Sequence, residues 1–143
     1  MTIKEGICGF ENDEVRWLSN FYMSSVRYLG ITYPSSEHAY QAQKTLDLVE
    51  RQQIATLKTP GQAKRAGKAV KMRSDWEQVK DQIMEDIVRI KFQSNPVLMA
   101  KLLSTGDLYL EETNTWNDTY WGVCKGRGQN KLGKILMKVR DQL

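Results

Sequence analysis

The stretch VRYLGITYPSSEHAYQAQK, residues 26–44, contains the change from strand to helix that decides the fold class. Its first half alternates in polarity and turns at Leu29-Gly30, a pattern that predicts a β-hairpin over residues 26–33. The two serines that follow can accept hydrogen bonds from the unpaired amides of a first helical turn. We therefore expect a small β element followed directly by a helix over residues 35–44.

A longer helix is predicted over residues 74–92, SDWEQVKDQIMEDIVRIKF. Ser74 and Glu77 stand in capping-box spacing, in which each side chain accepts a hydrogen bond from a backbone amide of the first turn. Apolar side chains recur at intervals of three and four residues, which is the spacing of one buried helix face. The stripe expected in the core consists of Trp76, Val79, Ile83, Ile87 and Ile90.

Helical patterns dominate the rest of the chain. Small residues at helical spacing in residues 60–70 predict a helix that another helix or a ligand can approach closely. A shorter helix is expected from Pro96 to near Gly106, then a strand over residues 107–112, and a last helix follows an aromatic, glycine-rich loop. The sequence thus predicts an α+β fold, predominantly helical, with a small N-terminal β element, in one compact domain over residues 1–143.

The composition limits the classes of partner. The 143 residues include 21 basic and 17 acidic side chains, and the formal net charge of +4 mildly favours anionic partners such as phosphates, nucleotides or nucleic acid. Two widely separated cysteines and one histidine argue against a zinc site or a disulfide framework. The chain shows no signal-peptide pattern and no window with the roughly 18 apolar residues of a membrane span, so we expect a cytoplasmic protein, with neither metal nor organic cofactor.

The helix at residues 35–44 places polar side chains in one row. At about 100° per residue, they share a narrow face that can hold a ribose, supply an acid or base and offer an amine for carbonyl chemistry. The same spacing is typical of a water-facing surface with a weak ion pair, so the pattern alone leaves both interpretations open. The row consists of Glu37, Tyr40, Gln41 and Lys44. The opposite face, expected to pack on the core, consists of Ala39, Ala42, Leu46 and Val49.

The single histidine, His38, points about 100° away from Glu37, toward the boundary between the two faces. We therefore interpret it as a packing residue or a support for the site rather than a catalyst. Without cysteine neighbours it does not indicate a metal site.

The loop at residues 116–133 combines aromatic rings, glycines and basic side chains around Asp118. Glycines let backbone amides approach a ligand, and a helix that starts near Asn130 would direct its positive end there, so an anionic group is the expected guest. Aromatic rings can stack on a heterocycle to which Asp118 hydrogen-bonds. A surface turn with buried tryptophans is the alternative interpretation. Residues 128–135 only partly match a P-loop, because Ile135 replaces the Ser or Thr that binds magnesium.

Five blocks of the chain together resemble the NADAR family, also called YbiA-like. They are WLSNFY at residues 17–22, SSEHAYQAQK at 35–44, WEQVKDQIM at 76–84, NDTYWG at 117–122 and GQNKLGKILMKVR at 128–140. Their order and spacing extend over nearly the full chain, and the combination is far more specific than any one block. The resemblance implies a mostly helical α+β domain that hydrolyses N-glycosidic bonds to ribose.

Matching positions carry the family's roles onto this sequence. The resemblance implies that Glu37 and Lys44 are catalytic, and Asp118 is expected to act with them as an acid or base. Asn130 and Gly133 match the family's terminal NxLG motif. The residues expected to bind substrate or to shape the pocket are Asn20, Phe21, Tyr40, Gln41, Glu111, Trp121, Gly122, Arg127 and Asn130.

Two mechanisms are open for this chemistry. In the first, the amine of Lys44 captures the opened sugar at C1 as a Schiff base that water later releases. This requires an unprotonated lysine: burial or a neighbouring cation lowers its pKa, whereas the charge of Glu37 opposes that change. In the second, water activated by Glu37 or Asp118 attacks through an oxocarbenium-like transition state, and Lys44 only binds hydroxyls or phosphate.

Three functions fit the residues. The first is the removal of ADP-ribose from guanine bases in DNA, RNA or free nucleotides. The second is hydrolysis of a phosphorylated ribosylamine related to riboflavin biosynthesis, with the basic loop binding one phosphate. The third is a non-catalytic module that binds ADP-ribose or NAD, and the presence of both Glu37 and Lys44 disfavours it because a pure binder does not need that pair.

Overall fold

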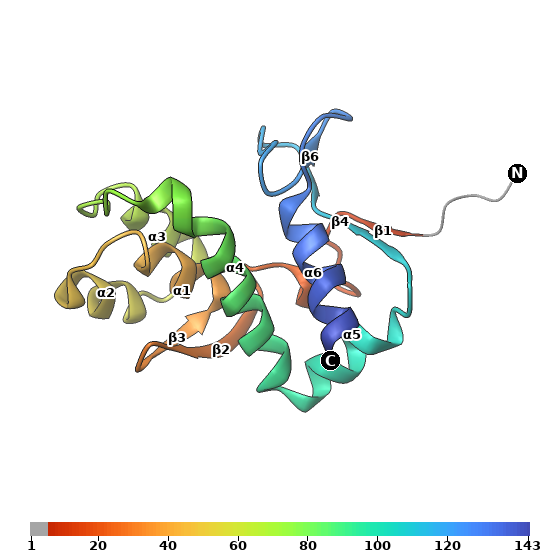
Figure 1. Ribbon diagram of the computed structural model, residues 1–143, viewed down its shortest axis with the longest axis horizontal. Coiled ribbons are helices and arrows are strands. Elements are labelled where there is room, and N and C mark those ends of the chain that lie inside the picture. Colours follow the sequence, from red (N-terminus) through yellow and green to blue (C-terminus); the bar gives the residue numbers. More distant parts are fainter. Residues whose placement is uncertain (1–5) are drawn as a thin grey trace, which may run out of the picture. The chain divides into compact units, whose positions relative to one another are not determined.

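The computed structural model describes residues 6–143 and divides into two compact units. The central unit is Asn20–Ser94, and the terminal unit combines the chain up to Ser19 with Asn95–Leu143. The described residues form helices and a few short strands, which confirms a predominantly helical α+β fold (Figure 1). The expectation of one domain over residues 1–143 includes residues 1–5, which lie outside the described residues, and it stays a prediction.

The predicted hairpin forms the sheet of the central unit. β2 (Met23–Tyr28) and β3 (Ile31–Ser35) pair antiparallel, with Val26 opposite Tyr33. The two turn residues, Leu29 and Gly30, have φ values of 49° and 87°. Two positive φ values in succession are typical of the tight turn whose twist matches that of paired strands. The hairpin prediction is therefore confirmed.

Helix α1 (Ser36–Ala42) begins directly after β3. Ser35 is its N-cap residue, and its Oγ accepts a hydrogen bond from the backbone N–H of His38 at 3.2 Å, which confirms the predicted serine cap. The helix ends earlier than expected. Lys44 lies in the following turn, where its N–H donates to the carbonyl oxygen of Gln41 at 3.2 Å.

Two short helices, α2 (Leu48–Ala55) and α3 (Pro60–Gly67), pack against α1. A capping box fixes the start of α3, because the Thr59 hydroxyl accepts from the N–H of Gln62 while the Gln62 side chain accepts from the N–H of Thr59. The small-residue face predicted here, Ala63, Ala66, Gly67 and Val70, is confirmed in part. Ala63 and Gly67 are buried where α3 meets α1, whereas Ala66 is half-buried and Val70 lies beyond the helix.

Helix α4 (Trp76–Gln93) is the longest helix of the described chain and packs against β2 and α1 (Figure 1). The predicted capping box at its start is wrong. Asp75 is the N-cap residue and makes no side-chain bond to the first turn; its Oδ1 instead accepts from Nε of Arg73 at 2.6 Å. The predicted apolar stripe is confirmed, with Trp76, Ile83 and Ile87 buried and the other two positions half-buried.

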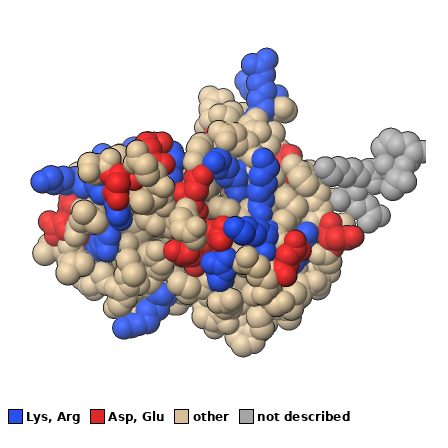
Figure 2. Space-filling model, in the orientation of Figure 1, with Lys and Arg blue, Asp and Glu red and all other residues tan. Residues whose placement is uncertain are grey.

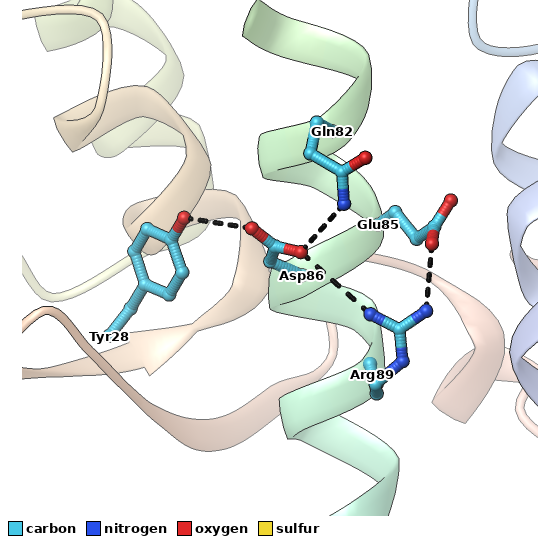
Figure 3. A network of polar contacts seen from close by, with 5 residues as sticks. All are labelled: Tyr28, Gln82, Glu85, Asp86 and Arg89. Atoms are coloured by element: carbon cyan, nitrogen blue, oxygen red, sulfur yellow. Dashed lines mark hydrogen bonds and ion pairs between the residues drawn. The ribbon is translucent and has the colours of Figure 1, made fainter.

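A polar network ties α4 to the hairpin, as Figure 3 shows. Asp86 accepts hydrogen bonds from the Tyr28 hydroxyl at 3.3 Å and from Nε2 of Gln82 at 2.9 Å. One turn further on, Nη2 of Arg89 donates to Glu85 at 2.7 Å. Burial, together with the neighbouring charge of Asp86, raises the pKa of Tyr28, so the hydroxyl keeps its proton and can donate it to this contact.

Short parallel strand pairs organise the terminal unit. β1 (Gly6–Cys8) pairs with β4 (Tyr109–Glu111), and β5 (Thr113–Asn114) pairs with β6 (Val123–Cys124). The strand predicted over residues 107–112 is thus confirmed in shorter form. A 3₁₀ turn, η1 (Arg16–Leu18), completes the first part of the unit.

Two helices complete the terminal unit. In α5 (Pro96–Ser104), Oδ1 of Asn95 caps the start by accepting from the amides of Val97 and Leu98, and the helix confirms the prediction from Pro96. α6 (Lys131–Gln142) is the predicted last helix, and it packs on β4. Its buried face consists of Leu132, Ile135, Leu136 and Val139.

The surface carries mixed charge. On the face drawn in Figure 2, basic and acidic side chains are interspersed rather than segregated by sign. Within residues 6–143, none of the helices combines the length and the apolar character needed to cross a bilayer.

Candidate functional site

Helix α1 is enclosed on every side, so the interpretation of its polar row as a water-facing surface is wrong. Glu37, Tyr40 and Gln41 are 8%, 5% and 4% exposed. The expectation for the opposite face fails in part, because Leu46 and Val49 lie beyond the helix and are exposed. Charged and polar side chains are rarely enclosed unless they are hydrogen-bonded or functional, which makes this helix the first candidate for a site.

Two members of the row contact each other inside this enclosure. Nε2 of Gln41 donates to Oε2 of Glu37 at 2.7 Å. The pair follows the i, i+4 spacing of a helix, so the sequence prediction that these side chains share one face is confirmed. A buried carboxylate with a fixed direction can serve as an acid or base for a substrate that reaches it.

Lys44 follows α1, is half-buried and lies within range of the charge of Glu37. Burial lowers the pKa of its amine below the ordinary lysine value, and this effect outweighs the charge of Glu37, which acts in the opposite direction. Lys68, Lys64 and Lys80 lower the pKa further. The sequence alone left this balance open, and in the tertiary structure burial outweighs the charge of Glu37, which is the direction that favours a nucleophilic amine.

Asn20 holds the first turn of α1 in place. Its carbonyl oxygen accepts from the N–H of Glu37 at 3.1 Å, and its Oδ1 accepts from the Ser36 hydroxyl at 3.0 Å. The predicted role of Asn20 in shaping the site therefore has a physical basis, because it anchors the backbone that carries Glu37. Phe21, the next residue, is half-buried.

His38 is fully enclosed and its ring nitrogens are occupied. Nε2 lies 3.0 Å from the Leu57 carbonyl oxygen, so we assign the ring proton to Nε2, and Nδ1 accepts from the Ser35 hydroxyl at 2.7 Å. Burial lowers the pKa of His38, which keeps the ring neutral. The packing role expected for this residue is confirmed.

Tyr40 packs against an aromatic neighbour. Its ring centroid lies 5.2 Å from that of Trp76, at an interplanar angle of 54°. Trp76 begins α4 and is itself buried. This ring contact holds α1 against the start of α4 at Tyr40, which lies between Glu37 and Gln41 in the sequence.

In the terminal unit, Asp118 organises the aromatic loop. Its Oδ1 accepts from the backbone amides of Tyr120 at 3.1 Å and Trp121 at 2.9 Å. The Asn114 side chain bonds to both backbone groups of Asp118: its Nδ2 donates to the Asp118 carbonyl oxygen, and its Oδ1 accepts from the Asp118 N–H. The rings of Tyr120 and Trp121 stand edge to face at 4.9 Å. Asp118 therefore has a structural task in addition to the catalytic one that we expected.

Glu111 and Asn130 are also held by their own chain. Glu111 accepts from the Tyr109 hydroxyl at 3.0 Å and from the Thr113 hydroxyl at 2.5 Å. Asn130 donates through Nδ2 to the Leu110 carbonyl oxygen at 3.0 Å and accepts at Oδ1 from the N–H of Glu112. The Asn130 amide thus joins β4 to the start of α6.

The positive end of α6 is closed by the loop itself. The amides of residues 129–132 donate to the carbonyl oxygens of residues 119–122 at 2.8–3.2 Å. We expected these amides to bind an anionic ligand. That expectation is wrong for the amides of residues 129–132, because each already donates to a carbonyl oxygen of the loop.

Two other predicted residues of this loop differ in exposure. Gly122 is buried, and a Cβ there would lie 1.9 Å from a Glu112 oxygen. Arg127 is exposed.

The predicted site residues thus form two groups, one in each unit. The central group contains Asn20, Phe21, Glu37, Tyr40, Gln41 and Lys44, and the terminal group contains Glu111, Asp118, Trp121, Gly122, Arg127 and Asn130. The central group combines a carboxylate with an amine whose pKa is lowered.

The family follows from comparison with known proteins. The family model of the NADAR domain matches residues 9–143. This chain belongs to the NADAR family. It is 41% identical over 135 residues to N-glycosidase YbiA of Escherichia coli strain K12, an alignment that covers 92% of this chain and 84% of that protein. N-glycosidase Npun_R5314 of Nostoc punctiforme is 36% identical, with 87% and 83% coverage.

A second class of NADAR relative carries a different name. The riboflavin biosynthesis protein VVA0006 of Vibrio vulnificus is 39% identical over 145 residues, which cover 99% of this chain but 39% of that longer protein. Among solved structures, the NMR structure of E. coli YbiA matches with a TM-score of 0.84 at 36% identity, covering 99% of this chain and 86% of that chain.

The NxLG motif of this NADAR chain has a packing explanation. A Cβ at Gly133 would lie 2.2 Å from the Leu110 carbonyl oxygen and 2.4 Å from Nδ2 of Asn130. The two motif residues therefore let α6 approach β4 closely. Pattern matching associated Asn130 with substrate, but the contacts that it makes are to its own backbone.

Lys91, on α4 of the same NADAR chain, is not among the residues predicted from the sequence. Its side chain is 1% exposed, and burial lowers the pKa of its amine to about 7. Nζ lies 5.8 Å from the ring centroid of Tyr22 and 5.1 Å from that of Phe92. A signal was present, because Lys91 continues the apolar stripe four residues after Ile87. Across residues 6–143, no three His, Cys, Asp or Glu side chains gather closely enough to hold a metal ion.

Proposed function

We propose that this NADAR chain is an N-glycosidase that hydrolyses the bond between C1 of a ribose and an amine nitrogen. The observation that carries the proposal is the buried Glu37 carboxylate, whose charge acts on Lys44, an amine with a lowered pKa. The names of the YbiA and Nostoc relatives, both N-glycosidases, support the same class of reaction.

In this mechanism Lys44 is the nucleophile. Ring opening of the substituted ribose leaves C1 doubly bonded to the amine nitrogen. The neutral lysine nitrogen adds to C1 to form a geminal diamine, and the C1–N bond to the leaving amine then breaks as the C1=N bond to lysine forms. The leaving nitrogen takes up the proton that the lysine nitrogen loses. Water then adds to C1 of the Schiff base, and loss of the lysine amine releases the free sugar.

Glu37 is the group that moves the protons. Its carboxylate can take a proton from the Lys44 nitrogen once that nitrogen has added to C1, pass it to the leaving nitrogen, and later remove one from the attacking water. In the competing mechanism, Glu37 or Asp118 activates water directly and Lys44 only binds hydroxyls or phosphate. The backbone contacts of Asp118 favour Glu37 for this task.

The substrate that we propose first is ADP-ribose attached to a guanine base, in nucleic acid or as a free nucleotide. The lysines that lower the pKa of Lys44, together with the net charge of +4, favour a polyanionic substrate. A phosphorylated ribosylamine is the second candidate, supported by the Vibrio relative named a riboflavin biosynthesis protein. The third candidate is a non-catalytic module that binds ADP-ribose or NAD. It is disfavoured because binding alone does not require both Glu37 and Lys44.

The first prediction separates these substrates. The protein is incubated in parallel with ADP-ribosylated guanosine, an ADP-ribosylated oligonucleotide and a ribosylamine 5-phosphate, and the released sugar is measured. We expect sugar release from the ADP-ribosylated guanine substrates, and binding to the oligonucleotide should weaken steeply with salt. Release from the ribosylamine alone would select the second candidate, and binding without release in every arm would select the third.

A second prediction concerns the proton on Lys44. Glu37→Gln removes the charge that raises the pKa of Lys44, so the amine should become reactive at lower pH than in the wild type. Lys64→Met and Lys68→Met remove charges that lower this pKa, so in these variants the amine should become reactive only at higher pH. The measurement is the pH dependence of reductive methylation at Lys44, followed by mass spectrometry.

Lys71→Met is the matched control, because this exposed lysine follows the same helix α3 and is not among the charges that act on Lys44. Its methylation profile should coincide with that of the wild type. Shifts in the same direction for the Glu37 and lysine variants would contradict the assigned electrostatics.

A further inference from the structure

The two ends of the Gln41 side chain have different surroundings. Nε2 donates to Oε2 of Glu37 at 2.7 Å. A carboxylate only accepts hydrogen bonds, so the amide has to turn its N–H end toward Glu37 and its carbonyl end away. The direction of this amide is therefore set by the carboxylate.

The carbonyl end of Gln41 faces α3 without a donor. Its Oε1 is buried and has no hydrogen-bond partner. A Cβ at Gly67 would lie 1.9 Å from this oxygen and 2.8 Å from Cδ of the same side chain. Only a glycine at position 67 leaves room for the amide as it stands, and the enclosure argues against a direct contact between Oε1 and substrate.

A buried acceptor without a partner destabilises the folded protein. Methionine has nearly the same shape as glutamine and would fill the space between α1 and α3 without that cost. The Gln41 amide donates an N–H to Glu37, and a methionine side chain has no such donor. The contact with the carboxylate is thus the property of Gln41 that packing does not explain.

We propose that Gln41 is a positioning residue for Glu37, and that Gly67 provides the space in which its amide takes the required direction. The inference rests on the proposed function, because it assigns Glu37 a proton-transfer task. Asn20 holds the backbone at Glu37, and Gln41 holds its carboxylate. A glutamate side chain has three rotatable bonds, and a displacement of about 1 Å at a reacting group is enough to cost about a hundredfold in rate.

The test begins with Gln41→Met. We expect kcat for the cleaved substrate to fall at least about tenfold, with KM changed by less than about threefold, because proton transfer and not binding is impaired. The unfolding midpoint should change little, since the lost hydrogen bond is offset by removal of the unpartnered oxygen. Gln52→Met, on the exposed face of α2, is the matched control and should keep wild-type kcat and KM.

A double variant separates positioning from packing. Gly67→Ala should lower both kcat and the unfolding midpoint, because the added methyl displaces the Gln41 amide. The two contacts closest to that methyl are Oε1 and Cδ of Gln41, which alanine lacks, so Gly67→Ala combined with Gln41→Ala should recover most of the midpoint. The double variant should nevertheless keep the low kcat, since the N–H on Glu37 is still missing.

The outcomes are distinguishable. If the wild type releases sugar and Gln41→Met keeps its kcat, or if the double variant regains wild-type kcat, this inference is overturned and the proposed function stands. If the wild type releases no sugar from any substrate, the proposed function fails and this inference fails with it.

Discussion

Lys44→Arg is expected to abolish the trapping of sugar on the protein by borohydride and to lower the rate of sugar release at least about tenfold. Arginine keeps a positive charge at this position, but its guanidinium does not lose a proton in proteins and cannot form a Schiff base. The variant therefore separates a covalent role of residue 44 from a binding role. Lys44→Ala, which removes both, should be at least as slow.

The measurement combines turnover with mass spectrometry after reduction. In the wild type, borohydride added during turnover should leave one sugar adduct on the peptide that contains Lys44. Folding is checked by circular dichroism and the unfolding midpoint, and Lys71→Arg serves as the control because this lysine is exposed in the same unit. Near-wild-type turnover by Lys44→Arg without an adduct in the wild type would establish direct attack by water.

Glu37→Gln belongs to the same comparison. It keeps the shape of the side chain but removes the proton-carrying group, so the rate should fall at least about tenfold in either mechanism. Reactivity of Lys44 should persist, because the amine itself is unchanged. Unaltered turnover by this variant would remove Glu37 from the mechanism.

Gly133→Ala is expected to destabilise the protein by at least about 3 kcal/mol. A Cβ at this position would lie 2.2 Å from the carbonyl oxygen of Leu110, which belongs to the backbone of β4 and cannot rotate away. Helix α6 would have to move off the strand, and its buried apolar face would lose contacts. Urea unfolding followed by circular dichroism measures the change.

Two further variants sharpen this prediction. Gly61→Ala adds a methyl near the start of α3, where the nearest atoms are 3.9 Å away, and should leave the free energy of unfolding close to that of the wild type. Asn130→Ala removes two of the three close contacts at Gly133 but leaves the Leu110 carbonyl oxygen, so the double variant should not recover. Recovery would show that the side chain, and not the strand backbone, limits the approach of α6.

Local pattern was sufficient for much of the candidate site. The helix after Ser35 and the shared face of Glu37 and Gln41 depend on contacts within one or two turns, which spacing encodes. The family resemblance then selected Glu37 and Lys44 from the other polar residues. Spacing failed for the face that includes Leu46 and Val49, because α1 ends before them and the chain changes direction.

The terminal loop shows where local reasoning was misleading. The prediction of an anion site rested on glycines, aromatic rings and a helix that starts near Asn130. Each of these features is present in the structure. The amides at the start of α6 are bonded instead to carbonyl oxygens from residues 119–122. Sequence pattern does not show which segment of the same chain will occupy a helix end.

By itself, the sequence determined the hairpin turn at Leu29-Gly30, the serine cap of α1 and the apolar stripe of α4, because each depends on neighbours along the chain. Only the tertiary structure decided that α1 is enclosed, that Gly67 makes room for the Gln41 amide and that burial outweighs Glu37 in lowering the pKa of Lys44. The physical reason is that desolvation depends on segments distant in sequence, here α2, α3 and α4 packed around α1.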